Sequence, residues 1–367
     1  MYHFLSIITL LSFFIWGKYY RDTKNIKYWS SAIIPIFVYS LSYGLRDGWG
    51  ADFEHYKDIF EHLRSTDPCL YALNNLINWL GFGSTFAFII YSVILSCGFF
   101  YIVKGYKNEA IYILPLLWVC STDACGLIRY WIAIGWILIS LYFYLQQSYY
   151  KSIIFFVIAV GTHISVILFL PIVLICNWKD YFKKRWVLMG IFIVFTALFD
   201  KEILGEKIIM PATDFLSKYI NNERLNMYND DAEFWFSGNR VTMIAKTETN
   251  EIINRIRMGL THGIILYLGF GVKNRYKNGV IFFNLMAVGL ILYNTVQGFE
   301  LVNRYIETLR MFLAFILGFI IAEQRKYPLI NNKLIFWSLI VFCYVNLFYR
   351  AFLGTDTLLL YNRYIWD

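Results

Sequence analysis

The chain has 367 residues, of which 59% are hydrophobic, 20% aromatic and only 16% charged, and its formal net charge is +8. A soluble domain carries about 25% charged residues, and a single core cannot bury this much apolar surface. The composition therefore excludes an ordinary soluble protein and indicates one that lies in a lipid bilayer. We expect no nucleic-acid partner, because the distribution of the positive charges fits membrane topology better.

Apolar segments recur along the whole chain, and a membrane-spanning helix needs about 20 residues to cross ~30 Å of hydrocarbon. We predict an all-α polytopic membrane protein that forms a single domain over residues 1–367, with about 10–12 transmembrane or half-length helices. The predicted segments are 2–17, 28–45, 82–103, 109–121, 127–146, 152–161, 164–177, 186–200, 258–272, 279–297, 305–322 and 334–352.

Basic residues gather in every second connection between these segments. The connections in question contain 17 Lys and Arg residues against four Asp and Glu residues, and they are 18–27, 104–109, 147–151, 178–185, 273–278 and 323–333. Short loops rich in Lys and Arg stay on the cytoplasmic side of a membrane. We therefore predict that both termini are extracytoplasmic.

Several predicted segments are shorter than a full crossing, and polar turns follow or join them at two places. Residues 152–177 are interpreted as two short arms that meet at Gly161-Thr162-His163, because a single span would place the basic cluster 179–185 outside. Ten helical residues rise only ~15 Å, so His163 would lie below the outer surface. Segment 109–121 is also short, and the polar turn after it would place Arg129 at a similar depth. Polar turns at this depth must face protein or water, which predicts an outward-facing cavity.

Two long connections fall on the predicted outer face. Residues 46–81 form the first extracytoplasmic loop, and their second half has apolar residues at helical spacing, which predicts an amphipathic interfacial helix. Residues 201–257 form a large extracytoplasmic loop, and loops of this length are usually functional.

Arg46 and Asp52 open the first of these loops within a glycine-containing stretch. Arg46 could bind an anionic group while Asp52 accepts a proton from a hydroxyl. An ion pair that only ties the loop to the bundle is the equally weighted alternative.

Arg129 and His163 are the candidates inside apolar segments. A guanidinium at membrane depth costs ~2.5–3.5 kcal/mol on insertion scales and usually marks a pathway or a partner, although Arg129 could instead extend to the lipid headgroups. His163 could act as a base or contact a phosphate, and simple packing is its alternative.

Arg304, Glu307 and Arg310 follow one another at a spacing of three, which places them on one face of a helix. An internal set of ion pairs would explain this spacing. Together with Arg46 and Arg129, however, Arg304 and Arg310 fall on the predicted outer side, and four arginines among apolar spans suit a diphosphate.

The pattern around the first outer loop resembles the EpsG family of Wzy-like polysaccharide polymerases. That family has Arg-x-x-x-Gly-x-Asp-Tyr-x-x-Tyr at this place, and this chain has Arg46, Gly50, Asp52, Phe53 and Tyr56. The stretch after Pro68, the elements at Arg129 and His163 and the late arginine at Arg304 follow in the same order as in the family. Phe53 replaces the usual Tyr, and Tyr130 stands where the family often has Gln.

The resemblance implies a glycosyltransferase C-type bundle in a bacterial cytoplasmic membrane that works without cofactor or catalytic metal. Its substrate would be an undecaprenyl-diphosphate-linked oligosaccharide, and its reaction would transfer the growing glycan to the non-reducing end of the next repeat. A chain-length regulator and a flippase would be further partners. We assign Arg129, Arg304 and Arg310 to the diphosphates, with Arg46 as a fourth, Asp52 or His163 as the base, and Tyr56 to a sugar.

Three other functions remain alternatives at this stage. A lipid-linked oligosaccharide flippase or transporter would also have broken helices and intramembrane charges, but it should show polar residues through the full depth of the bundle. An O-antigen ligase would share the fold and the donor and differ in the acceptor. A membrane acyltransferase would need His163 on the opposite face.

Overall fold

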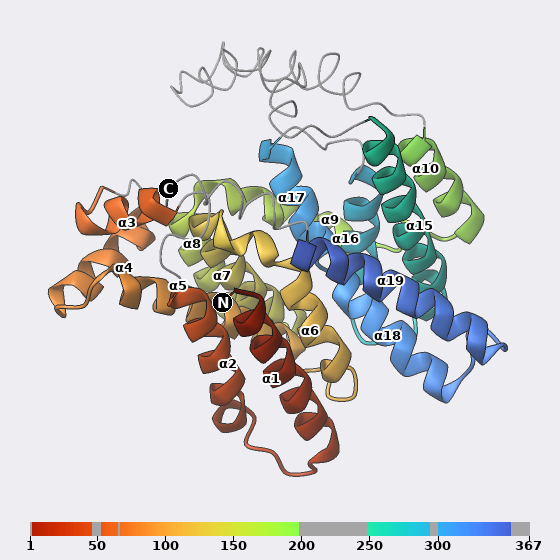
Figure 1. Cartoon of the computed structure of the whole chain (residues 1–367), viewed down its shortest axis with the longest axis horizontal. Helices are drawn as coiled ribbons and strands as arrows, with labels where there is room; N and C mark the ends of the chain where they lie inside the picture. Colours follow the sequence, from red (N-terminus) through yellow and green to blue (C-terminus); the bar gives the residue numbers. More distant parts are fainter. Residues whose placement is uncertain (1, 46–52, 65–66, 198–247, 294–299, 354–367) are drawn as a thin grey trace. The chain divides into compact units, whose positions relative to one another are not determined.

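A computed structural model describes residues 2–45, 53–64, 67–197, 248–293 and 300–353 (Figure 1). Every regular element in these ranges is a helix, which confirms the predicted all-α class. The chain forms two compact units. The first contains Met1–Ile175, Leu317–Pro328 and Leu347–Asp367, and the second contains Cys176–Ile316 and Leu329–Asn346.

The first unit holds most of the helices that precede residue 175. They are α1 (Tyr2–Asp22), α2 (Tyr28–Gly44), α3 (Phe53–Glu61), α4 (Pro68–Trp79), α5 (Ser84–Val103), α6 (Ala110–Cys120), the 3-10 helix η1 (Thr122–Cys125), α7 (Ile128–Leu145), α8 (Tyr149–Thr162), the 3-10 helix η2 (Ile164–Leu168) and the start of α9 (Phe169–Trp178). The second unit holds α10 (Arg185–Ala197), α15 (Glu248–Val272), α16 (Gly279–Leu292), α17 (Glu300–Arg310), the start of α18 (Leu313–Lys326) and most of α19 (Lys333–Leu353).

Most predicted segments correspond to one helix each, and three differ. Segment 164–177 is divided between η2 and α9. α15 begins at Glu248, ten residues before its predicted apolar segment, because a helix can continue through polar residues after it leaves an apolar environment. The predicted segment 305–322 is divided between α17 and α18. Around Met311 and Phe312 the backbone makes i→i+3 hydrogen bonds, including Phe312 N–H to Leu309 O at 3.2 Å, which tightens the helix locally.

The two predicted breaks at polar turns both occur. α6 has only 11 residues and is followed by η1, and α8 ends at His163, whose extended backbone (φ −157°, ψ 112°) separates it from η2. These are the half-length elements expected from residues 109–126 and 152–177.

Length and composition together support a membrane protein. In the described ranges three helical stretches are long and apolar enough to cross a bilayer, and several shorter apolar helices accompany them. The three are Ser84–Val103, Ile128–Leu145 and Val302–Lys326, the last of which runs through α17 and α18. Large apolar side chains also point outward, for example Ile34 (68% exposed), Val157 (60%) and Leu334 (77%). Such exposure on many helices is costly in water and favourable in lipid.

Close approach of α5 and α7 organises the first unit. Gly98 and Gly135 face each other where these helices cross, and a Cβ atom at Gly98 would lie 2.6 Å from the carbonyl oxygen of Gly135. Small residues of this kind allow membrane helices to pack backbone to backbone. α3 and α4 then cover the end of α5 and α7 with an apolar face that includes Phe53, Phe60 and Leu70.

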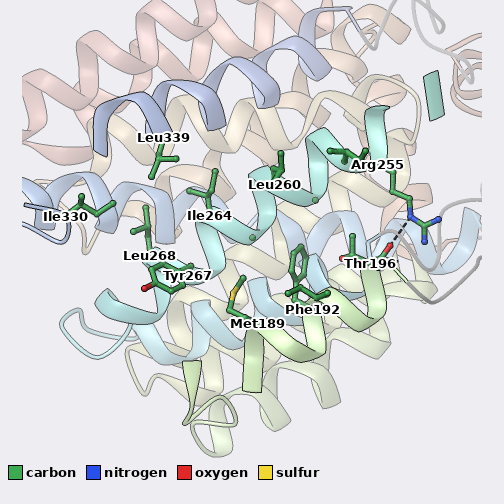
Figure 2. A pocket seen from close by; sticks show the side chains of 15 residues that line it. Met189, Phe192, Thr196, Arg255, Leu260, Ile264, Tyr267, Leu268, Ile330 and Leu339 are labelled. Carbon is green, nitrogen blue, oxygen red and sulfur yellow. Dashed lines mark hydrogen bonds between the residues drawn. The ribbon is translucent and has the colours of Figure 1, made fainter. Parts of the chain in front are cut away.

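A groove runs along α10 and α15 in the second unit (Figure 2). Its volume is about 690 Å³, and its lining is mainly apolar, with Met189 and Phe192 from α10 and Leu260 and Ile264 from α15. Arg255 lies at one end of it, where its Nε donates a hydrogen bond to the backbone oxygen of Thr196 at 2.9 Å.

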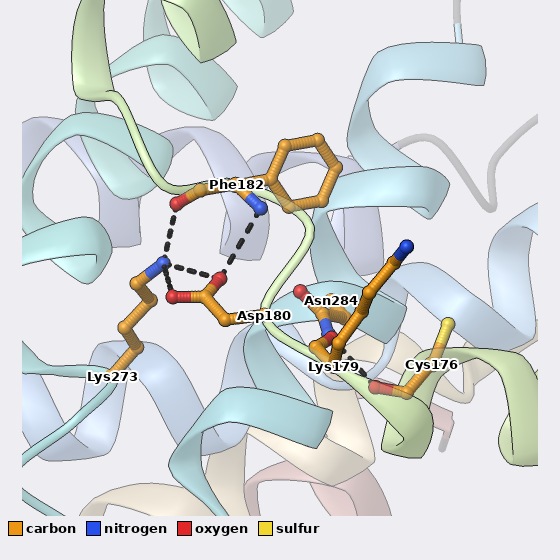
Figure 3. Close-up of polar contacts among 6 residues, drawn as sticks. All are labelled: Cys176, Lys179, Asp180, Phe182, Lys273 and Asn284. Atoms are coloured by element: carbon orange, nitrogen blue, oxygen red, sulfur yellow. Dashed lines mark hydrogen bonds and ion pairs between the residues drawn. The ribbon is translucent and has the colours of Figure 1, made fainter.

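In the same unit, a buried lysine makes polar contacts with the segment between α9 and α10 (Figure 3). Lys273 is 1% exposed, and its Nζ lies 2.6 Å from both carboxylate oxygens of Asp180 and 2.5 Å from the backbone oxygen of Phe182. Nearby, the amide of Asn284 donates to the backbone oxygens of Cys176 and Lys179 at 2.8 and 2.9 Å. These bonds hold the connection 179–185 in place, and Lys273 is an ion-pair partner of Asp180.

Candidate functional site

Arg129 is the centre of a polar cluster in the first unit. It is the second residue of α7, and its Nη1 lies 3.0 Å from Oδ2 of Asp67. Its guanidinium carbon lies 5.5 Å from the centre of the Tyr56 ring. A cation at a helix N-terminus is unfavourable by itself, so the carboxylate and the ring both stabilise it there.

Asp67 is available to Arg129 because of its place in the fold. It precedes Pro68, the first residue of α4, and its side chain makes no capping hydrogen bond to that helix. The side chains of Arg129 and Asp67 are 16% and 8% exposed, so this is a largely buried ion pair. The ion pair uses Nη1 of Arg129, and its Nε has no hydrogen-bond partner among the described residues.

His163 lies close to this cluster. Its ring is perpendicular to that of Tyr130, the residue after Arg129, with centroids 5.9 Å apart. Two residues earlier, Gly161 approaches Cys69 of α4 so closely that a Cβ atom would lie 2.4 Å from its Sγ. The predicted elements at Arg129 and His163 are therefore packed together through α4, α7 and α8.

Arg310 forms a second and similar arrangement in the second unit. Its Nη2 lies 2.6 Å from Oε2 of Glu307, and its guanidinium carbon lies 4.9 Å from the centre of the Tyr293 ring. Arg310 and Glu307 are both 4% exposed. Nε and Nη1 of Arg310 have no hydrogen-bond partner in the part of the chain that the structure describes.

Arg304 lies on the same helix, one and a half turns before Arg310, and it is partly exposed. Internal ion pairs were the alternative to diphosphate binding for Arg304, Glu307 and Arg310, and the Glu307–Arg310 contact is such a pair. The pairing occurs, and it uses one terminal nitrogen of Arg310.

His262 is a residue that the sequence interpretation missed. It is fully buried in α15, and its ring is perpendicular to that of Tyr293 at 4.9 Å. The signal was present in the sequence, because residue 262 falls inside the predicted span 258–272 and ionisable residues in spans are usually functional. Asp67 was also missed, since nothing in the sequence relates it to a residue 62 positions later.

Tyr56, which the sequence analysis assigned to a sugar, has its ring against Arg129. It is 8% exposed and presents its ring to Arg129, so it supports the cation, and a direct sugar contact stays a prediction. Arg46 and Asp52 lie outside the described residues, as does most of the predicted loop 201–257. No group of three or more His, Cys, Asp and Glu side chains is placed to bind a metal ion in the ranges described above.

These features define a helical membrane protein with largely buried arginines, some of whose N–H groups have no hydrogen-bond partner among the described residues. Comparison with known families gives a match to the EpsG family over residues 29–363. The chain belongs to the EpsG family, the family of Wzy-like polysaccharide polymerases, and the resemblance noted in its sequence is thereby confirmed. No curated protein and no solved structure gives a significant match to the chain.

Proposed function

We propose that the chain polymerises lipid-linked oligosaccharide repeats at the outer face of a bacterial cytoplasmic membrane. The donor is a growing glycan on undecaprenyl diphosphate, and the acceptor is the next repeat on the same carrier. Family membership supports polymerisation in general. The observation that supports the diphosphate is that Arg129 and Arg310 are buried and hold N–H groups for which no described residue is an acceptor.

The reaction sets clear requirements for these residues. A hydroxyl at the non-reducing end of the acceptor attacks the anomeric carbon of the donor and loses its proton to a base. The anomeric carbon–oxygen bond breaks, and its electrons go to the diphosphate, which leaves on its lipid. Fixed guanidinium groups stabilise this developing charge because they are already oriented and partly desolvated. Arg129, Arg304 and Arg310 have this role in our proposal, with Arg46 as a fourth cation.

The base is Asp52 or His163 in this proposal. A carboxylate or an imidazole can each remove the hydroxyl proton at neutral pH, provided it lies within hydrogen-bond reach of the acceptor. The packing of His163 beside Tyr130 and the Arg129 cluster supports its presence near the leaving group. Asp52 is supported by its position in the family pattern that begins at Arg46.

Purified protein with a synthetic undecaprenyl-diphosphate-linked repeat tests the proposal directly. We expect a ladder of products that differ by one repeat, resolved on a gel, and free undecaprenyl diphosphate in equal number to the bonds formed. Arg129→Ala should leave single repeats unextended. A product that appears only when a lipid core is supplied as acceptor would indicate a ligase, and a wild-type protein that moves the substrate across vesicles without forming bonds would indicate a flippase.

A further inference from the structure

The groove along α10 and α15 belongs to neither arginine cluster, and its chemistry is that of a lipid-chain site. Met189, Phe192, Ile264 and Leu268 line it, and its few polar lining residues include Thr196 and Arg255. Its volume of about 690 Å³ lies in the range of pockets that bind small ligands. An apolar site of this size with one cation at its end suits a long hydrocarbon that carries a phosphate.

Two glycines of α15 create the space. Gly259 and Gly263 line the groove one turn apart, on the face toward α10. A Cβ atom at Gly259 would lie 3.3 Å from Cγ2 of Thr196, and one at Gly263 would lie 3.3 Å from Cε1 of Phe192. A larger residue at either position would therefore press on Thr196 or Phe192 of α10 and change the shape of the groove.

The groove is open along its side. Ile193, Ile256 and Leu260 all contribute to its lining, and they are 58%, 58% and 56% exposed. Because α10 and α15 carry predicted spans, we expect this side to face the bilayer. A lipid chain could then enter laterally, without passing through water.

The two ends of the groove differ, because Arg255 lies at only one of them. Figure 2 shows Arg255 and Thr196 at one end and Ile330 at the other. Thirteen helical residues from Arg255 to Leu268 rise about 20 Å, which is roughly two-thirds of a ~30 Å hydrocarbon core. Arg255 falls on the predicted outer side, so a phosphate beside it would continue into a chain that runs inward.

We propose that this groove binds the polyprenyl chain of the lipid-linked glycan, with Arg255 as a further cation toward the diphosphate end of that chain. The inference rests on the proposed function, which supplies the substrate class. The shape, the apolar lining, the lateral opening and the cation at the outer end each correspond to one part of that lipid.

Photo-cross-linking of the full-length protein tests the site without requiring turnover. The probe is a polyprenyl diphosphate with a photoreactive group on its isoprenoid chain, applied to the protein in nanodiscs. We expect labelled peptides from α10 and α15, and loss of labelling when unlabelled polyprenyl diphosphate is added. Labelling elsewhere would overturn the proposal, as would equal labelling by a photoreactive phospholipid or a groove shown to be covered by the protein's own chain.

Enzyme kinetics provide the second measurement. Gly263→Leu should raise the KM for the lipid-linked donor about tenfold with little change in kcat, since it displaces about two methylene-sized groups of the bound chain. Gly190→Leu is the matched control, because nothing lies within 4 Å of a Cβ atom at Gly190 on α10. An unchanged KM in Gly263→Leu would overturn the groove assignment while wild-type polymerisation still supports the function. Wild-type protein that binds the probe in the groove but forms no polymer would overturn the function alone.

Discussion

Arg129 and Arg310 have the same surroundings although they belong to different units. Each pairs with one carboxylate, Asp67 or Glu307, through a single terminal nitrogen, and each lies against a tyrosine ring. The carboxylate reduces the cost of burying the guanidinium before substrate arrives. In our proposal, the N–H groups that have no described partner bind the diphosphate and stabilise the charge that develops on it as it leaves.

Variants of Arg310 and Glu307 distinguish a substrate role from a structural one. We expect Arg310→Ala to lower kcat by about 10²–10³, the usual effect of removing one donor that stabilises developing charge. Arg310→Lys should recover only part of the rate, because lysine keeps the charge and loses the planar fork. Initial rates of ladder formation measure both.

Glu307→Gln is the control for this pair. It removes the charge that faces Arg310 and keeps the side chain's size. If Arg310 serves only its ion pair, Glu307→Gln and Arg310→Ala should reduce thermal stability and activity to the same extent, and the diphosphate assignment would be wrong.

The Lys273–Asp180 pair makes a separate prediction about stability. Lys273→Met should lower the free energy of unfolding by about 3 kcal/mol, the lower end for a broken buried pair, because it leaves the Asp180 carboxylate without its partner. Asp180 is 26% exposed, which reduces the cost. Thermal unfolding in detergent measures the effect, and the exposed Lys183→Met is the matched control.

Adding Asp180→Asn to Lys273→Met should recover part of the lost stability, since no charge is then buried alone. A double variant as unstable as the single one would show that packing of the lysine stem, rather than charge, accounts for the loss.

At the level of elements, helix contacts in the first unit depend on small residues. The α5–α7 crossing allows no side chain at Gly98, because the nearest atom is the backbone oxygen of Gly135 and a backbone cannot move as a side chain can. This crossing holds α7 against α5, and Arg129 is the second residue of α7.

Gly98→Ala tests this dependence. We expect it to lower the melting temperature in detergent by several degrees, as overpacking of ~1–3 kcal/mol would. Gly105→Ala is the control, because nothing lies within 4 Å of a Cβ atom there and the change should be neutral or slightly stabilising. Equal melting temperatures for the two variants would mean that the crossing tolerates a methyl group.

At the level of the whole molecule, the arginines of α7 and α17 lie on the outer side only if both termini are extracytoplasmic, as predicted. The prediction rests on the 17 basic and four acidic residues of the proposed cytoplasmic connections, and the Lys273–Asp180 pair joins one residue of each kind, which leaves the difference between the two unchanged. This excess still favours a cytoplasmic location for these connections.

Cysteine labelling of intact cells tests the orientation. In a cysteine-free background, Glu54→Cys on α3 should react with a membrane-impermeant thiol reagent added outside, and Lys151→Cys at the start of α8 should react only after lysis. Both native side chains are exposed, so accessibility depends on the side of the membrane. The opposite pattern would reverse the topology and exclude an outer active site.

The all-α class, most of the helices and the breaks at the two polar turns could be predicted from the sequence. These features follow from local chemistry: apolar length defines a span, and polar turns such as 161–163 cannot continue through lipid. The same local information identified Arg129, Arg304 and Arg310 as costly residues that need an explanation.

The contacts of these residues became known only from the packing of the helices. Asp67 reaches Arg129, Tyr293 lies between His262 and Arg310, and Asp180 neutralises Lys273 across 93 residues of sequence. The groove along α10 and α15 is equally a product of packing, since its walls come from helices separated in the chain. Such partners cannot be predicted from spacing, because contacts between distant segments depend on how whole helices pack rather than on any local pattern.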